Sequence, residues 1–186
     1  MTADNTTQLV LALLGFALVA AAFGWSAYGR AIWPPVSALA LASAAVIAAV
    51  ADEISAGRVE LTILVALAGL LAVVGGGPVT TRIFGMVDRQ DVDRQDDESQ
   101  TIDQAGQVLR GGAWIGALER LAVFAGLAAG FPEGVAVVLA LKGVGRFPDL
   151  RGDRGSGAAT ERFIIGTFTS VLWAAACAGM VALVRR

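Results

Sequence analysis

The sequence predicts an all-α integral membrane protein with six transmembrane helices in two groups of three. The chain has 186 residues, of which 56% are hydrophobic and only 16% are charged, and its mean hydropathy is +0.68. Soluble domains carry about 25% charged residues. The chain contains apolar runs of 14 to 22 residues, and about 20 residues cross a hydrocarbon core. They are too long and too uninterrupted for the strands of a barrel, which leaves helices.

The first group is predicted from three apolar runs, over residues 9–28, 36–51 and 61–74. The segment before the first run carries Asp4 and no basic residue, unlike the positively charged start of a secretory signal. The first run is therefore expected to be retained as a helix. Trp33-Pro34-Pro35 lies between the first two runs and is expected to mark the boundary between two helices.

Helix breakers follow the third run. Gly75-Gly76-Gly77-Pro78 is expected to loosen or end that helix, with residues 79–87 as an interfacial segment. Residues 88–107 are acidic, since seven of the sixteen acidic residues lie between Asp88 and Asp103. Such a polar segment with few large apolar side chains is typical of a linker. It divides the chain into a membrane half at 1–87, the linker at 88–107 and a second membrane half at 108–186.

The second group is predicted over residues 111–130, 131–147 and 163–184. The middle run is about 25 Å long as a helix, so it is either a short span or a re-entrant segment. Three spans in each half would give the halves opposite orientations, as in transporters built from inverted repeats.

Loop charges set the expected orientation. Ten basic residues fall in the loops after the first, third and fifth spans, and the other side holds Arg58, Arg185 and Arg186. Basic loops stay on the cytoplasmic side. The linker is therefore expected in the cytoplasm and both termini outside. The arginine-rich composition, with abundant Ala, Gly and Val, indicates a prokaryotic cell membrane.

Glu119-Arg120 is the most informative dipeptide, because it lies in the middle of the fourth predicted span. Charges at that depth are costly and are usually paired inside the bundle. Adjacent helical residues point about 100° apart and are poor partners for each other. The available partners on other helices are Lys142, Glu161 and Arg162. The five residues are interpreted either as an ion or proton path or as a structural salt-bridge network.

Small residues spaced four apart predict close helix contacts at two places, Gly112 with Gly116 and Gly166 with Ser170. Packing within the chain is the favoured interpretation and dimerisation the alternative. The hydroxyls of Thr167 and Ser170 are available to bond across helices, to bond back to their own helix or to coordinate an ion.

A basic, glycine-rich loop follows the fifth run and carries Arg146, Arg151 and Arg154. One interpretation is a site for the headgroups of anionic lipids. The other is an ordinary anchor on the positively charged cytoplasmic side.

The composition argues against most catalytic chemistry. The chain has no histidine, and Cys177, its one cysteine, lies in an apolar run, so disulfides, histidine metal sites and Ser-His-Asp catalysis are excluded. The carboxylates cluster in the linker instead of on facing helices. We therefore expect no enzyme activity, no cofactor, no metal site and, without a strongly basic surface, no nucleic-acid binding.

The second half resembles a module of uncharacterised bacterial membrane proteins. The motifs are GAWIGALER at 112–120, ALKGVGRF at 140–147 and ERFIIGT at 161–167, in the same order as in that family. The resemblance covers residues 108–184 only, because family members begin with a helix bearing His and Asp. It implies a shared fold and polar network, with the matching charged positions Glu119, Arg120, Lys142, Arg146 and Glu161, but no reaction.

These observations favour a small transporter or channel-like protein with an intramembrane charged network. The alternative is a non-catalytic accessory or scaffold subunit of a larger membrane complex. A lipid-modifying enzyme that uses the basic loop is a third, weaker option. The expected partners are the lipid bilayer, anionic lipid, and further copies of this chain or other subunits.

Overall fold

A computed structural model describes residues 3–26, 29–51, 56–92, 112–151 and 157–185 of the chain. Residues 88–92 of the predicted linker are helical, and its remaining residues, 93–107, lie outside these ranges. The described part is helical, with short connecting turns. Its helices are α1 (Ala3–Phe23), α2 (Trp33–Val50), α3 (Arg58–Val92), α5 (Gly112–Ala128), α6 (Glu133–Arg151) and α7 (Gly157–Val184).

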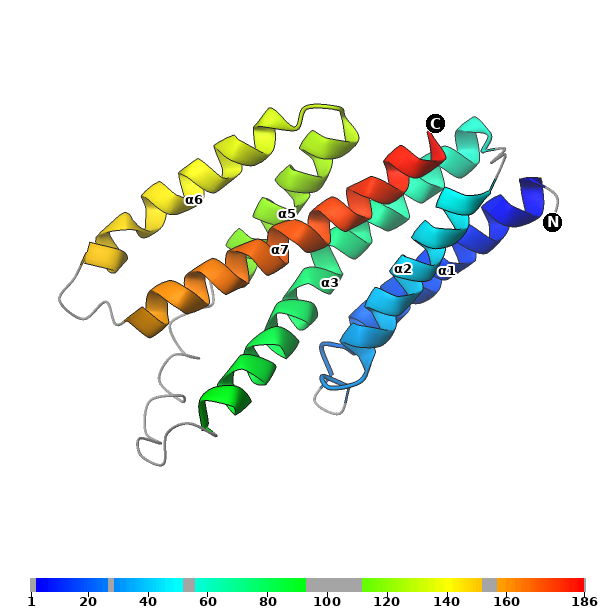
Figure 1. Cartoon of the computed structure of the whole chain (residues 1–186). Coiled ribbons are helices and arrows are strands. Elements are labelled where there is room, and N and C mark those ends of the chain that lie inside the picture. The colour runs from blue at the N-terminus through cyan, green and yellow to red at the C-terminus, as the bar shows by residue number, and fades with distance from the viewer. Residues whose placement is uncertain (1–2, 27–28, 52–55, 93–111, 152–156, 186) are drawn as a thin grey trace.

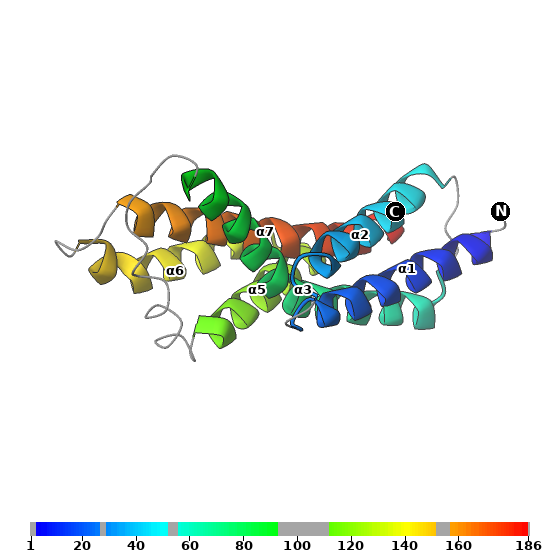
Figure 2. The same cartoon turned by 90° about the horizontal axis from the view of Figure 1, so that it is seen from below.

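Helices α3 and α7 form the centre of the molecule (Figure 1). The α1–α2 hairpin packs on one side of this pair and the α5–α6 hairpin on the other (Figures 1 and 2). Both halves of the chain contribute to one apolar core, in which Leu14, Leu71 and Met180 are fully buried. Helix α6 lies at the edge and packs mainly against α5.

Four of the helices are long and apolar enough to cross a membrane, over Asp4–Phe23, Trp33–Val50, Arg58–Val87 and Thr160–Val184. They suggest that the protein associates with a membrane. Helix α5 has only 17 residues, with Glu119 and Arg120 at its middle, and α6 carries Lys142 among its apolar residues. Spans at α5 and α6 therefore stay predictions, as does the re-entrant alternative for α6.

Helix α1 begins and ends about five residues before its predicted bounds. Asp4 lies in the first turn, where a negative charge interacts favourably with the helix dipole. The chain turns after Phe23, whose carbonyl accepts a hydrogen bond of 2.7 Å from Ser26 Oγ. Helix α2 begins at Trp33, and Pro34 and Pro35 occupy its first turn, where their missing N–H groups have no intrahelical acceptor to lose.

The expectation that Gly75-Gly76-Gly77-Pro78 ends the helix is wrong, because α3 continues through this segment, and through the predicted interfacial residues 79–87, to Val92. Figure 2 shows α3 changing direction along its length, as helices do at proline. Pro78 has no N–H, so the Val74 carbonyl lacks its usual intrahelical donor. Trp25 Nε1 donates to that carbonyl at 3.0 Å, which offsets the loss.

Each glycine of this segment admits a large side chain from a different part of the fold. A Cβ added at Gly75 would overlap the Trp173 indole of α7, and one at Gly76 would overlap Arg120 of α5. At Gly77 it would lie 2.7 Å from Trp25 Cζ2. Successive helical residues point about 100° apart, so three partners approach α3 from three sides. Trp173 Nε1 also donates to the α3 carbonyl of Leu71 at 3.0 Å.

Helix α5 ends at a glycine in the left-handed region. Gly130 has φ +78°, and its N–H donates to the Leu127 carbonyl at 3.1 Å. The Phe131 N–H donates to the Gly126 carbonyl at 2.8 Å, which completes a Schellman motif. This turn leads directly into α6 and sets the two helices of the hairpin side by side (Figure 1).

The close approach of α7 to α3 predicts that Gly75→Ala lowers the free energy of unfolding by about 1–3 kcal/mol, because the rigid Trp173 ring must shift. Gly85→Ala is the matched control in the same helix, since a Cβ there meets nothing within 4 Å. The control should be neutral or slightly stabilising, as alanine favours helix. The free energies of unfolding of both variants are measured in detergent micelles by circular dichroism. Equal free energies for the two variants would contradict the packing of Trp173 on Gly75.

Candidate binding cleft

An open cleft of about 820 Å³ lies among α3, α5, α6 and α7. Its walls include the apolar side chains of Phe84, Leu118, Leu141 and Phe163, together with Trp25. Four charged side chains also line it, namely Glu119, Arg120, Lys142 and Arg162. The cleft therefore combines apolar walls with a charged region, as binding sites for small molecules commonly do.

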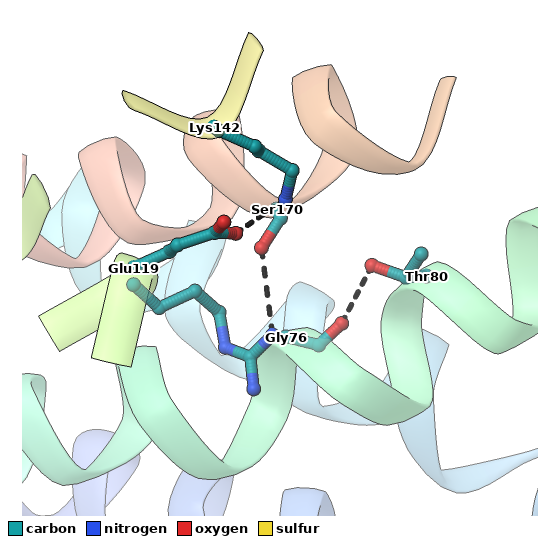
Figure 3. Close-up of polar contacts among 6 residues, drawn as sticks. Gly76, Thr80, Glu119, Lys142 and Ser170 are labelled. Carbon is teal, nitrogen blue, oxygen red and sulfur yellow. Dashed lines mark hydrogen bonds and ion pairs between the residues drawn. The ribbon is translucent and has the colours of Figure 1, made fainter. Parts of the chain in front are cut away.

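Glu119 of α5 and Lys142 of α6 form an ion pair in this cleft (Figure 3). Their side chains are only 16% and 21% exposed. Lys142 Nζ also lies 5.9 Å from the centroid of the Phe163 ring on α7, within the range of a cation–π interaction. The pair links the edge helix α6 to α5, and Lys142 is one of the partners that the sequence suggested for Glu119.

Arg120 is buried, with 7% of the residue exposed, and its hydrogen bonds go to other partners. Its Nε donates to the Val73 carbonyl of α3 at 3.1 Å, and its Nη1 donates to Ser170 Oγ of α7 at 3.4 Å. The sequence suggested a charged partner on another helix; among the described residues, the hydrogen-bond acceptors of Arg120 are instead neutral. The 100° between neighbouring helical residues explains why Glu119 and Arg120 serve different contacts.

The remaining members of the predicted network lie at the start of α7. Arg162 is exposed and lines the cleft, whereas Glu161 is exposed and is not among the described residues that line it. The structure therefore brings Glu119, Arg120, Lys142 and Arg162 to one cavity, and Glu161 is not among the residues described as lining it.

The predicted small-residue contacts serve two different purposes. Gly112 and Gly116 line the cleft, and a Cβ at Gly116 would lie 3.2 Å from Arg120 Nη1. A Cβ at Gly166 would lie 2.9 Å from Phe84 Cζ, so this glycine permits close packing of α7 on α3. Ser170 accepts the Arg120 hydrogen bond, and these contacts are all within the chain.

A second, much smaller cavity of about 10 Å³ adjoins the ion pair and is lined by Glu119, Lys142, Thr167 and Ser170 among others. This volume corresponds to roughly one water molecule. The Thr167 hydroxyl is buried and has no hydrogen-bond partner within the described part of the chain. A buried hydroxyl without a partner is costly, so this donor is available to a water molecule or a ligand.

Sequence patterns did not indicate that Trp25 lines the cleft, that the Val73 carbonyl accepts from Arg120, or that Trp173 packs on Gly75. The available signal was the run of three glycines in an apolar segment, which indicates close approach by other side chains as well as helix breaking. The Thr80 and Thr81 hydroxyls donate to the carbonyls of Gly76 and Gly77, at 2.7 and 3.1 Å (Figure 3 shows Thr80).

Arg146 and Arg151 belong to the last part of α6 instead of a loop, and Arg154 lies outside the described residues, so the headgroup site stays a prediction. Within the described ranges, no three His, Cys, Asp or Glu side chains gather as metal ligands. Cys177 is buried in the apolar core.

Comparisons with protein families, with characterised proteins and with solved structures find no match to this chain. The function is therefore argued from the geometry of the cleft.

The ion pair predicts a measurable coupling between Glu119 and Lys142. Glu119→Gln and Lys142→Gln each leave a largely buried charge unpaired, so each should lower the free energy of unfolding by about 1–3 kcal/mol. The loss of unfolding free energy in the double variant should be smaller than the sum of the two single losses, by at least about 0.5 kcal/mol. Unfolding by SDS in mixed micelles measures the cycle, with exposed Glu133→Gln as control. Strictly additive losses would show that the pair contributes nothing.

Proposed function

We propose that the protein is a small membrane transport protein that binds its solute in the cleft. The observation that carries this proposal is the largely buried Glu119–Lys142 ion pair in the wall of an open cavity of about 820 Å³. Cavities of about 300–1,000 Å³ accommodate small molecules. Ionisable residues within membrane segments are costly, and those that persist commonly mark substrate or ion pathways.

The position of the pair supports a role in coupling. Lys142 lies on α6, which packs mainly against α5, so the pair is a main polar link between the edge helix and the rest of the bundle. Loss of this attraction and the position of α6 are therefore thermodynamically linked in this proposal, and solute bound in the cleft biases both.

The proposal includes six spans in a prokaryotic cell membrane, with the 88–107 linker in the cytoplasm and the termini outside. Four apolar helices support the spans, and the excess of Arg30, Arg89, Arg94 and Arg110 after the first and third spans over Arg58 after the second supports the orientation. The α5–α6 hairpin supplies the two additional, shorter spans.

An accessory subunit of a larger complex is the second candidate. Its support is apolar surface on the outer helices that lies away from the cleft: Trp114 of α5 is 74% exposed and Val144 of α6 is 72% exposed. Such residues contact either lipid or another subunit. Affinity purification from the native membrane separates the candidates, because a stoichiometric partner favours the subunit and a homo-oligomer without other proteins favours the transporter.

The transport proposal predicts that Glu119→Gln reduces solute uptake at least about tenfold, as removal of a charge used in coupling should. Liposomes containing the protein and carrying a pH gradient are incubated with a mixture of amino acids, phosphate esters, and short- and medium-chain carboxylates. Mass spectrometry then identifies what accumulates relative to empty liposomes.

Glu133→Gln is the matched control, because it is the same chemical change at an exposed residue at the start of α6, outside the cleft. It should transport like the unsubstituted protein. Uptake by Glu119→Gln at the control rate would remove this residue from the mechanism. Absence of any accumulated solute with the unsubstituted protein would contradict transport itself.

A further inference from the structure

The charges that line the cleft do not balance. Glu119 is the one described carboxylate in its lining, while Arg120 and Lys142 are cationic and Arg162 lines the same cavity. The three residues Glu119, Arg120 and Lys142 thus carry a formal charge of +1 together. Among the described residues, Nε and Nη1 of Arg120 donate to a carbonyl and a hydroxyl, and neither of these neutral acceptors carries a charge that would balance the guanidinium.

An excess positive charge among apolar helices is costly unless an anion compensates it. The neighbouring Thr167 hydroxyl adds a buried donor that has no partner in the described residues and also lines the cleft. Phosphate and carboxylate oxygens accept hydrogen bonds from cationic side chains and from hydroxyls. The chemistry of the inner cleft therefore favours an anionic group.

The apolar walls of the cleft favour a ligand that also has an apolar part. Ile115 and Leu118 of α5 and Leu141 of α6 line it and are each at least 59% exposed in the chain alone. An inorganic anion would satisfy the charge and leave these side chains uncovered. A ligand with an apolar chain would cover these side chains, which the hydrophobic effect favours.

We propose that the cleft binds an amphiphilic organic anion, a phosphate monoester or carboxylate that carries an apolar chain. The anionic group lies at Arg120, Lys142 and Arg162, and the chain lies along Ile115, Leu118 and Leu141. The inference rests on the proposed function in one respect, that the cleft is the solute site, and it names the class of solute.

Binding is tested with decyl phosphate by native mass spectrometry of the full chain released from detergent. Two probes separate the two properties: decanol has the same chain without charge, and inorganic phosphate has the charge without the chain. One decyl phosphate should bind per chain, and each partial probe should bind at least about tenfold more weakly. Equal binding of decanol or of inorganic phosphate would overturn the proposal.

Two glycines of α6 provide a matched pair of variants. A Cβ at Gly145 or at Gly143 meets nothing within 4 Å, but Gly145 lines the cleft and Gly143 does not. Gly145→Trp should therefore weaken decyl phosphate binding at least about tenfold by filling the cleft, whereas Gly143→Trp should leave it unchanged. Undiminished binding by Gly145→Trp would place the ligand elsewhere and overturn the proposal.

A charge variant keeps the test decisive if Gly145→Trp does not fold. Arg162→Gln should weaken decyl phosphate binding about tenfold through loss of a charge-assisted hydrogen bond. Arg58→Gln, at the start of α3 and away from the cleft, should have no effect. Equal affinities for these two variants would contradict a role for the cleft cation.

A competition arm identifies the source of the anion. If phosphatidylglycerol displaces decyl phosphate and phosphatidylcholine does not, the chemistry is confirmed and the bilayer supplies the ligand. If neither displaces it, the chemistry is equally confirmed and the ligand is a free amphiphile; displacement by both would show that charge is irrelevant and overturn the proposal. If decyl phosphate binds but no solute is taken up into liposomes, the transport proposal fails and the binding proposal stands. The two proposals can therefore fail separately.

Discussion

The Val74 carbonyl of α3 has no intrahelical donor, because the residue four positions later is Pro78. A carbonyl without a partner in apolar surroundings is unfavourable by about 1–3 kcal/mol. The fold meets this constraint by bringing the Trp25 indole to that carbonyl. In the same turns of α3, Trp173 donates to Leu71 and Arg120 donates to Val73. Donors from three other parts of the chain thus converge on the backbone of one helix.

These contacts also determine the geometry of the cleft. Arg120 is fixed between α3 and α7, with its side chain passing over Gly76, where no Cβ obstructs it. Because helical neighbours point about 100° apart, fixing Arg120 turns Glu119 toward α6 and Lys142. The bend of α3 and the edge position of α6 then leave the cavity between them open. The charged site therefore depends on the glycine–proline segment that holds Arg120.

Local sequence patterns predicted the features that depend on local physics. Long apolar runs indicated helices, prolines marked the start of α2, and the cost of an intramembrane charge pointed from Glu119 to a partner such as Lys142. The course of α3 could not be predicted in this way. Gly75 and Pro78 disfavour helix locally, and the donors that compensate lie about 50 to 100 residues away in sequence. The neutral acceptors of Arg120 likewise leave no sequence signature, since one is a backbone carbonyl.

A double-variant cycle of Trp25→Phe and Pro78→Ala tests the central claim most directly. In the natural chain, Trp25→Phe removes the only described side-chain donor to the Val74 carbonyl and should lower the free energy of unfolding by about 1 kcal/mol beyond lost packing. Pro78→Ala restores an N–H to that carbonyl, so Trp25→Phe should then cost less, with a coupling of at least about 0.5 kcal/mol. Exposed Trp114→Phe, measured in both backgrounds, should show no coupling. Strict additivity of Trp25→Phe and Pro78→Ala would contradict the account.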